Sequence, residues 1–236
     1  RRSSDLIMAN GNGLSNWTLP NNGVQSVLIV KKPGGSGNYL VFYRSFSSIS
    51  QCVLLYSEID MSLAASNGSV VSKNNLVSTF ISPNFSQIIT STRHCNGTDI
   101  WITCRDIYSQ PTPPVTQTVS CSFRSFLVTS AGINTVAVVS TPITYITNSR
   151  YVGSYSGGLK FSPNGKKLAT GIMMDDFTVG NNYHAFELFD FDNTTGLVSN
   201  RIGLSQYSLN PNFRPFGLDF SPDGTKLYGT LNYVFN

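Results

Sequence analysis

The stretch GLKFSPNGKKL, at Gly158–Leu168, recurs as GLDFSPDGTKL at Gly217–Leu227, with eight of eleven residues identical. In each copy, apolar residues alternate with polar ones before a Ser-Pro-Asn-Gly or Ser-Pro-Asp-Gly sequence, and apolar residues resume after it. The alternation is typical of half-buried strands, and the proline and glycine favour a tight turn between them. Each copy therefore predicts a β-hairpin, and its recurrence predicts a repeat architecture.

Two earlier segments fit the same template, with turns at Pro33-Gly34-Gly35 and Asn96-Gly97. The four turn glycines then follow one another at steps of 63, 68 and 59 residues: Gly34, Gly97, Gly165 and Gly224. The segments between these hairpins each contain a long strand, a polar turn and a shorter strand. Four antiparallel strands per step are the unit of a β-propeller blade. The predicted fold class is therefore all-β, a β-propeller of four-stranded antiparallel blades.

The repeats divide a single propeller domain, residues 1–236, into successive pieces. We predict complete blades near 24–80, 86–145 and 157–209, flanked by half-blades at 1–19 and 216–236. A closed propeller has about four to eight blades. These pieces therefore predict a partial propeller, a fragment of a larger ring.

Composition agrees with short strands joined by tight turns. Charged residues make up 12% of the chain, and there are 20 Gly and 11 Pro. The net charge of +4 is modest and the basic residues are scattered, which argues against a nucleic-acid partner. No apolar run reaches about 18 residues, so we expect no membrane insertion. The start, RRSSDLIMANGNG, reads as the interior of a longer chain.

The series SVLIVKKPGGSGNYLVFY, STRHCNGTDIWIT, GGLKFSPNGKKLA, FELFDFDNTTGLVSN and FGLDFSPDGTKLYGT resembles the β-propeller (WD40-like) module of Bacteroidetes secreted and cell-surface proteins. Those proteins carry a gliding-motility-associated C-terminal sorting domain. The resemblance covers roughly residues 5–231. It implies export by type IX secretion, an extracellular or cell-surface location, and flanking domains in a longer chain.

The chain departs from this family in its cysteines, because the family commonly has none at the positions of Cys52, Cys95, Cys104 and Cys121. Four cysteines in an exported chain suggest disulfides, and three connectivities are possible. We favour Cys104–Cys121. Cys104 ends the second strand of its blade and Cys121 begins the third, so antiparallel pairing can bring them opposite each other.

Catalytic and metal-binding signals are weak. The spacing of Asp190 and Asp192 resembles part of a calcium loop but lacks a third acidic ligand, so a strand end and hairpin are the favoured interpretation. His94 and His184 lack partners at zinc-ligand spacing. The predicted innermost strands carry one notable acid, Asp219, whereas propeller lactonases hold a metal with carboxylates around the channel. We therefore expect a non-enzyme without catalytic residues, metal or cofactor; a propeller-type hydrolase or lactonase with a channel metal is the alternative.

Three connections depart from the repeat, at 44–51, 105–120 and 173–184, and each joins the second strand of a blade to the third. In a regular propeller they emerge on one face, where binding is usually located. They carry aromatic and acidic side chains that could contact a sugar or a protein: Tyr108, Asp106, Asp175, Asp176, Phe177 and Tyr183. The sequence thus predicts a non-catalytic module that binds a surface glycan or protein, or spaces other modules; tolerated insertions are the competing interpretation of these loops.

Overall fold

The computed structural model describes most of the chain. The residues described are 8–14, 27–34, 37–48, 51–64, 67–81, 85–106, 108–109, 117–147, 151–153, 158–174, 183–184, 186–204, 206–207 and 213–233. Every regular element among them is a β-strand. The all-β class predicted from the sequence is confirmed.

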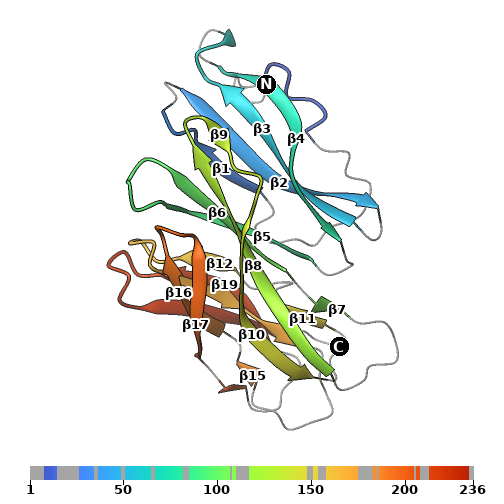
Figure 1. The fold of residues 1–236 in the computed structure, drawn as a ribbon, viewed down its shortest axis with the longest axis vertical. Coiled ribbons are helices and arrows are strands. Elements are labelled where there is room, and N and C mark those ends of the chain that lie inside the picture. The colour runs from blue at the N-terminus through green and yellow to red at the C-terminus, as the bar shows by residue number, and fades with distance from the viewer. Residues whose placement is uncertain are drawn as a thin grey trace.

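Three sheets of similar order follow one another along the chain (Figure 1). The first has the order β1-β2-β3-β4, from β1 (Val27–Lys31), β2 (Asn38–Ser48), β3 (Gln51–Asp60) and β4 (Ser69–Ile81). The second pairs β5 (Phe85–Arg93), β6 (Ile100–Asp106), β8 (Gln117–Thr129) and β10 (Val138–Thr147), with β9 (Gly132–Ile133) beside β8. The third pairs β12 (Leu159–Phe161), β13 (Lys167–Gly171), β16 (Phe186–Asp192) and β17 (Leu197–Gly203).

Smaller sheets complete the described structure. A fourth sheet consists of β19 (Phe213–Phe220) and β20 (Leu227–Tyr233). A three-stranded sheet has the order β14-β11-β7, from β14 (Met173–Met174), β11 (Tyr151–Gly153) and β7 (Tyr108–Ser109). A last pair joins β15 (Tyr183–His184) to β18 (Gln206–Tyr207).

The four hairpins predicted from the repeat are all present, as β1–β2, β5–β6, β12–β13 and β19–β20. The repeated Ser-Pro-x-Gly sequence makes the same turn twice. Ser162 and Ser221 each accept at Oγ a hydrogen bond of 2.9 Å from the backbone N–H of the lysine five residues later, Lys167 or Lys226. Gly165 and Gly224 adopt φ angles of 67° and 71°, which glycine tolerates best, and each donates its N–H to that serine carbonyl at 2.8 Å.

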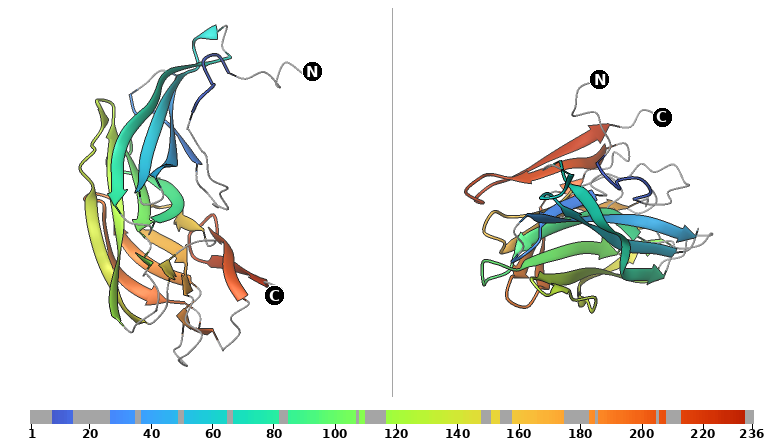
Figure 2. Two further views of the ribbon diagram at one scale, coloured as in Figure 1. Left: turned by 90° about the vertical axis from the view of Figure 1, so that its right-hand side faces the viewer. Right: turned by 90° about the horizontal axis from the view of Figure 1, so that it is seen from above.

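Neighbouring sheets meet through their first strands. β1 contacts β5, β5 contacts β12, and β12 contacts β19. Figure 2 shows the resulting stack of sheets as a curved body rather than a straight one. The first strands β1, β5, β12 and β19 therefore form one series of neighbours through the four main sheets.

The hydrophobic cores lie between sheets. Phe42, Leu54 and Phe126 belong to the core between the first and second sheets. Trp101 and Phe189 belong to the core between the second and third, and a smaller core joins the third to the fourth. Since side chains alternate between the faces of a strand, the second and third sheets are buried on both faces.

Residues 8–14 lie beside the outer strand of the first sheet. Ala9 forms a parallel bridge with Ser69, and the Asn10 side chain donates to the Val70 carbonyl at 2.7 Å. Over the described ranges, no helix has the length and apolar character needed to cross a bilayer.

Candidate functional site

The small sheet β14-β11-β7 brings two of the predicted surface loops together. Tyr108 lies opposite Val152, and Val152 lies opposite Met174. β7 belongs to the connection 105–120, and β14 opens the connection 173–184. Segments 65 residues apart thus share one sheet at the end of the second and third sheets where their second strands finish (Figure 1). This sheet is the candidate binding rim.

The predicted binding residues are described to different extents. Tyr108 lies on β7, and Tyr183 lies on β15 opposite Tyr207. For Tyr108 and Tyr183 the structure describes the position of the backbone in its strand. Asp175, Asp176 and Phe177 lie outside the described residues. Asp106, predicted in a loop, is instead the last residue of β6, and Arg124 donates to both of its carboxylate oxygens, at 3.0 and 3.3 Å.

The prediction of a long surface loop at residues 44–51 is wrong. β2 continues to Ser48, β3 begins at Gln51, and these two residues lie opposite each other in the ladder. The segment departs from the repeat, which suggested a loop, but serine residues can also pair across antiparallel strands. Arg44 is fully buried within this strand. The first sheet therefore adds a tight hairpin to this end of the molecule.

A buried charge network ties the second sheet to the third, and the sequence did not indicate it. The Arg105 guanidinium donates to Glu187 at 3.1 Å, with side chains 1% and 0% exposed, and Arg201 donates to the other carboxylate oxygen at 2.6 Å. Arg105 also lies 5.3 Å from the centre of the Phe123 ring. Arg44 occupies the equivalent position of the first repeat. One signal was available: an arginine stands five residues after Tyr39 and five after Ile100, the residues that lie opposite the last residue of the first strand in each sheet.

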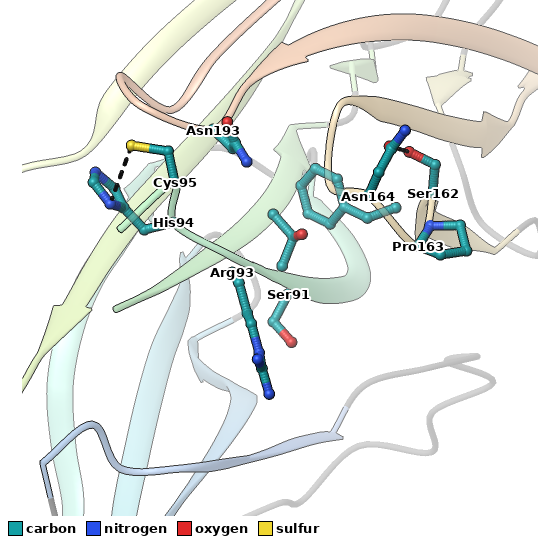
Figure 3. Close-up of a pocket in the computed structure, with 10 residues that line it drawn as sticks. Ser91, Arg93, His94, Cys95, Ser162, Pro163, Asn164 and Asn193 are labelled. Atoms are coloured by element: carbon teal, nitrogen blue, oxygen red, sulfur yellow. Dashed lines mark hydrogen bonds between the residues drawn. The ribbon is translucent and has the colours of Figure 1, made fainter. Parts of the chain in front are cut away.

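A pocket of about 500 Å³ lies at the opposite end of the sheets, where turns of the second and third sheets meet (Figure 3). Its lining consists of Ser91, Thr92, Arg93, His94, Cys95, Phe161, Ser162, Pro163, Asn164 and Asn193. Figure 3 shows Arg93 pointing away from His94 and Cys95. Most of its lining residues belong to the turns of two neighbouring sheets. The pocket therefore marks the junction between these sheets.

Hydrogen bonds across this junction fix the tautomer of His94. Its Nδ1 lies 3.1 Å from the N–H of Asn96 and therefore accepts, which makes Nε2 the protonated nitrogen. Nε2 donates to the Thr194 carbonyl at 3.1 Å. Trp101 Nε1 and the Cys95 N–H both donate to the Asn193 carbonyl, at 3.0 and 3.1 Å. The histidine thus acts as a connector between two sheets.

The carboxylates weighed for metal binding take part in local contacts. Asp190 accepts from Lys167 and from Asn200, and the Lys167 hydrogen bond is the main cause of its lowered pKa. Asp192 caps its turn by accepting from the Thr194 N–H at 2.9 Å. Asp219, on β19, lies 3.6 Å from Lys160 of β12. Within the described ranges, no three His, Cys, Asp or Glu residues group as metal ligands would.

Comparisons with known proteins give limited similarity. No protein-family model and no curated protein matches the chain. Among four matching solved chains, hydrazine synthase of Kuenenia stuttgartiensis has 14% identity and a TM-score of 0.39 over 87% of this chain and 58% of that one. A luciferin-regenerating enzyme has 15% identity and a TM-score of 0.35 over 89% and 56%. This chain thus spans less than two thirds of either protein.

The predicted Cys104–Cys121 disulfide is wrong, because the two side chains lie on opposite faces of the second sheet. Cys104 lies opposite Arg124, and an odd step of three residues separates Arg124 from Cys121. Cys104 belongs to the core between the first and second sheets, whereas Cys121 belongs to the next core. Cys52, Cys95, Cys104 and Cys121 are all free thiols, and Cys95 is the exposed one.

We expect one thiol per native chain, Cys95, to react with Ellman's reagent, and all four to react in denaturant. Burial raises the pKa of Cys52 to about 11 and raises the pKa of Cys104 and Cys121, which disfavours the reactive thiolate. A Cys95→Ser variant should show no fast reaction. A second fast thiol in the native wild-type protein would contradict the burial of the other three.

Proposed function

We propose that this protein is an exported, non-enzymatic β-propeller module that binds a surface glycan or protein through loops on one rim. Three features support the propeller: the repeated hairpins, the near-constant step, and the succession of contacts among β1, β5, β12 and β19. Burial of the second and third sheets on both faces also fits blades packed side by side. Export follows from the family that the sequence resembles.

One observation carries the binding proposal, namely the joining of β7 and β14 through β11. Two irregular connections are held together by backbone pairing, so their residues are presented as one surface on a rigid scaffold. Tyr108 lies on β7 of this rim. Asp175, Asp176 and Phe177 follow β14 in the sequence, and aromatic side chains with neighbouring carboxylates suit sugar stacking or protein contact. The proposed ligand is a surface glycan or a protein.

The rim is tested by replacing residues 175–177 with Gly-Ser-Gly and, separately, by Tyr108→Ser. We expect each change to weaken binding about tenfold on an array of neutral oligosaccharides and on immobilised surface proteins, because an aromatic anchor contributes 1–3 kcal/mol. Val136→Ser, an exposed change at the opposite end of the sheets, is the matched control. Circular dichroism establishes that the variants fold. Binding that survives both rim changes would refute the proposal.

A further inference from the structure

Several turns of this chain contain asparagine followed by glycine, a pair that is prone to spontaneous deamidation because glycine has no side chain to shield its backbone nitrogen. The described residues include five such asparagines: Asn10, Asn12, Asn67, Asn96 and Asn164. The reaction requires the glycine nitrogen to lose its proton and to reach the asparagine Cγ. A hydrogen bond from the glycine N–H or to the asparagine side chain slows the reaction, because local opening must come first.

Four of the five glycine amides are held by hydrogen bonds. Each donates its N–H to a backbone carbonyl at 2.8–3.1 Å: Gly11 to Met8, Gly68 to Leu63, Gly97 to His94 and Gly165 to Ser162. Three of the asparagine side chains are held as well. Asn10 donates to the Val70 carbonyl at 2.7 Å, and Asn96 and Asn164 accept at Oδ1 from a backbone N–H two residues later, at 3.0 and 3.1 Å.

Asn12 differs from the other four asparagines. Within the part of the chain that the structure describes, neither its side chain nor the Gly13 N–H has a hydrogen-bond partner, and both residues are exposed. No atom lies within 4 Å of a Cβ position at Gly13. The carbonyls of the two residues are held, because Lys73 donates to Asn12 at 2.7 Å and the Asn74 side chain donates to Gly13 at 3.0 Å. The reacting groups are therefore open to water on an otherwise fixed turn.

We propose that Asn12 is a modification site, at which water converts the asparagine to aspartate or isoaspartate in the folded protein. The Gly13 nitrogen gives its proton to water and forms a bond with the Asn12 Cγ. The bond from Cγ to Nδ2 breaks, and Nδ2 takes up a proton and leaves as ammonia. Water then attacks either carbonyl of the resulting succinimide and breaks its bond to the ring nitrogen, which regains a proton. No group is oxidised or reduced.

The isoaspartate product changes how residues 8–14 meet β4. In isoaspartate the main chain to Gly13 runs through the side-chain carbons, and the former Asn12 carbonyl becomes part of a free carboxylate. That carboxylate still faces the Lys73 ammonium, whereas the longer main chain moves the Gly13 carbonyl relative to Asn74. The change is irreversible in water, and the site is separate from the rim formed by β7, β11 and β14.

The test uses the folded wild-type protein in a mildly alkaline buffer made with heavy-oxygen water. Peptide mapping with fragment-ion analysis measures the label at each asparagine. We expect Asn12 to deamidate about tenfold faster than Asn10, Asn67, Asn96 and Asn164, because hydrogen bonds must open at those four sites. In denaturant the five sites should react at similar rates, since glycine follows each of them. That comparison separates the effect of the fold from that of the sequence.

Two variants check the assignment. Asn12→Ser should remove the fast phase of isoaspartate formation, which isoaspartyl methyltransferase detects. Asn67→Ser is the matched control, because Asn67 is also exposed but its glycine N–H is held; it should leave the fast phase unchanged. Equal rates at the five sites of the folded wild-type protein, or a fast phase that persists in Asn12→Ser, would overturn the proposal.

Discussion

Glu187→Gln lowers the free energy of unfolding by about 3–5 kcal/mol, the range for breaking a buried ion pair by removing one partner. Glu187 is completely buried and accepts from Arg105 and Arg201. The neutral amide keeps the size of the side chain but leaves the buried Arg105 guanidinium without its carboxylate. Arg201, 30% exposed, can turn toward water, so most of the loss concerns Arg105. Urea unfolding monitored by tryptophan fluorescence measures the change.

The matched control is Glu58→Gln in the first sheet. Glu58 also accepts from a basic side chain, Lys32 at 2.8 Å, but the two side chains are partly exposed. An ion pair with access to water contributes up to about 1 kcal/mol. Equal losses for the two variants would show that the Arg105–Glu187 pair is no more important than a surface pair.

Gly196→Ala destabilises the chain by about 2–4 kcal/mol, from backbone strain and overpacking together. Gly196 has a φ of 80°, in the left-handed region that disfavours a side chain. A Cβ at this position would lie 2.8 Å from the Trp101 ring. That ring is buried and held by its hydrogen bond to the Asn193 carbonyl, so it cannot move away without cost. Thermal and urea unfolding give the loss of stability.

Gly97→Ala separates strain from overpacking. Gly97 has a φ of 76°, close to that of Gly196, but no atom lies within 4 Å of the Cβ position. We expect this variant to lose about 1–2 kcal/mol, from the backbone alone. The difference between the two variants measures how tightly the β16–β17 turn packs against the second sheet. If both lose the same amount, Trp101 does not restrict the turn.

The hairpins could be predicted from the sequence because the interactions that form each turn lie within a few consecutive residues. Ser162 and Gly165 complete their turn with hydrogen bonds inside a six-residue segment, and Ser221 and Gly224 repeat it. The joining of β7 and β14 through β11 could be predicted only in part from the sequence. Sequence placed both connections on one face, but β11 joins them from a third connection whose sequence gave no strand signal.

The long-range contacts were beyond sequence reasoning. Arg105 and Glu187 are 82 residues apart. The sequence around either residue does not predict which side chain it contacts. The disulfide prediction failed for a related reason: proximity of two strands was inferred correctly, but the face of each side chain depends on register. β6 and β8 pair with Cys104 opposite Arg124, and a different register would have been needed to align the cysteines. A register is set by packing of whole sheets against neighbours.

The placement of the cores between sheets determines which duplications can add a repeat to such a chain. Among the described residues, each hydrophobic core takes side chains from two neighbouring sheets. Stability is then a sum of nearest-neighbour terms along the array. Tandem duplication of a whole unit copies both of its complementary faces at once, so the new unit fits between its parent and the next. Duplication that cuts through a unit separates the two faces and leaves one core half-built.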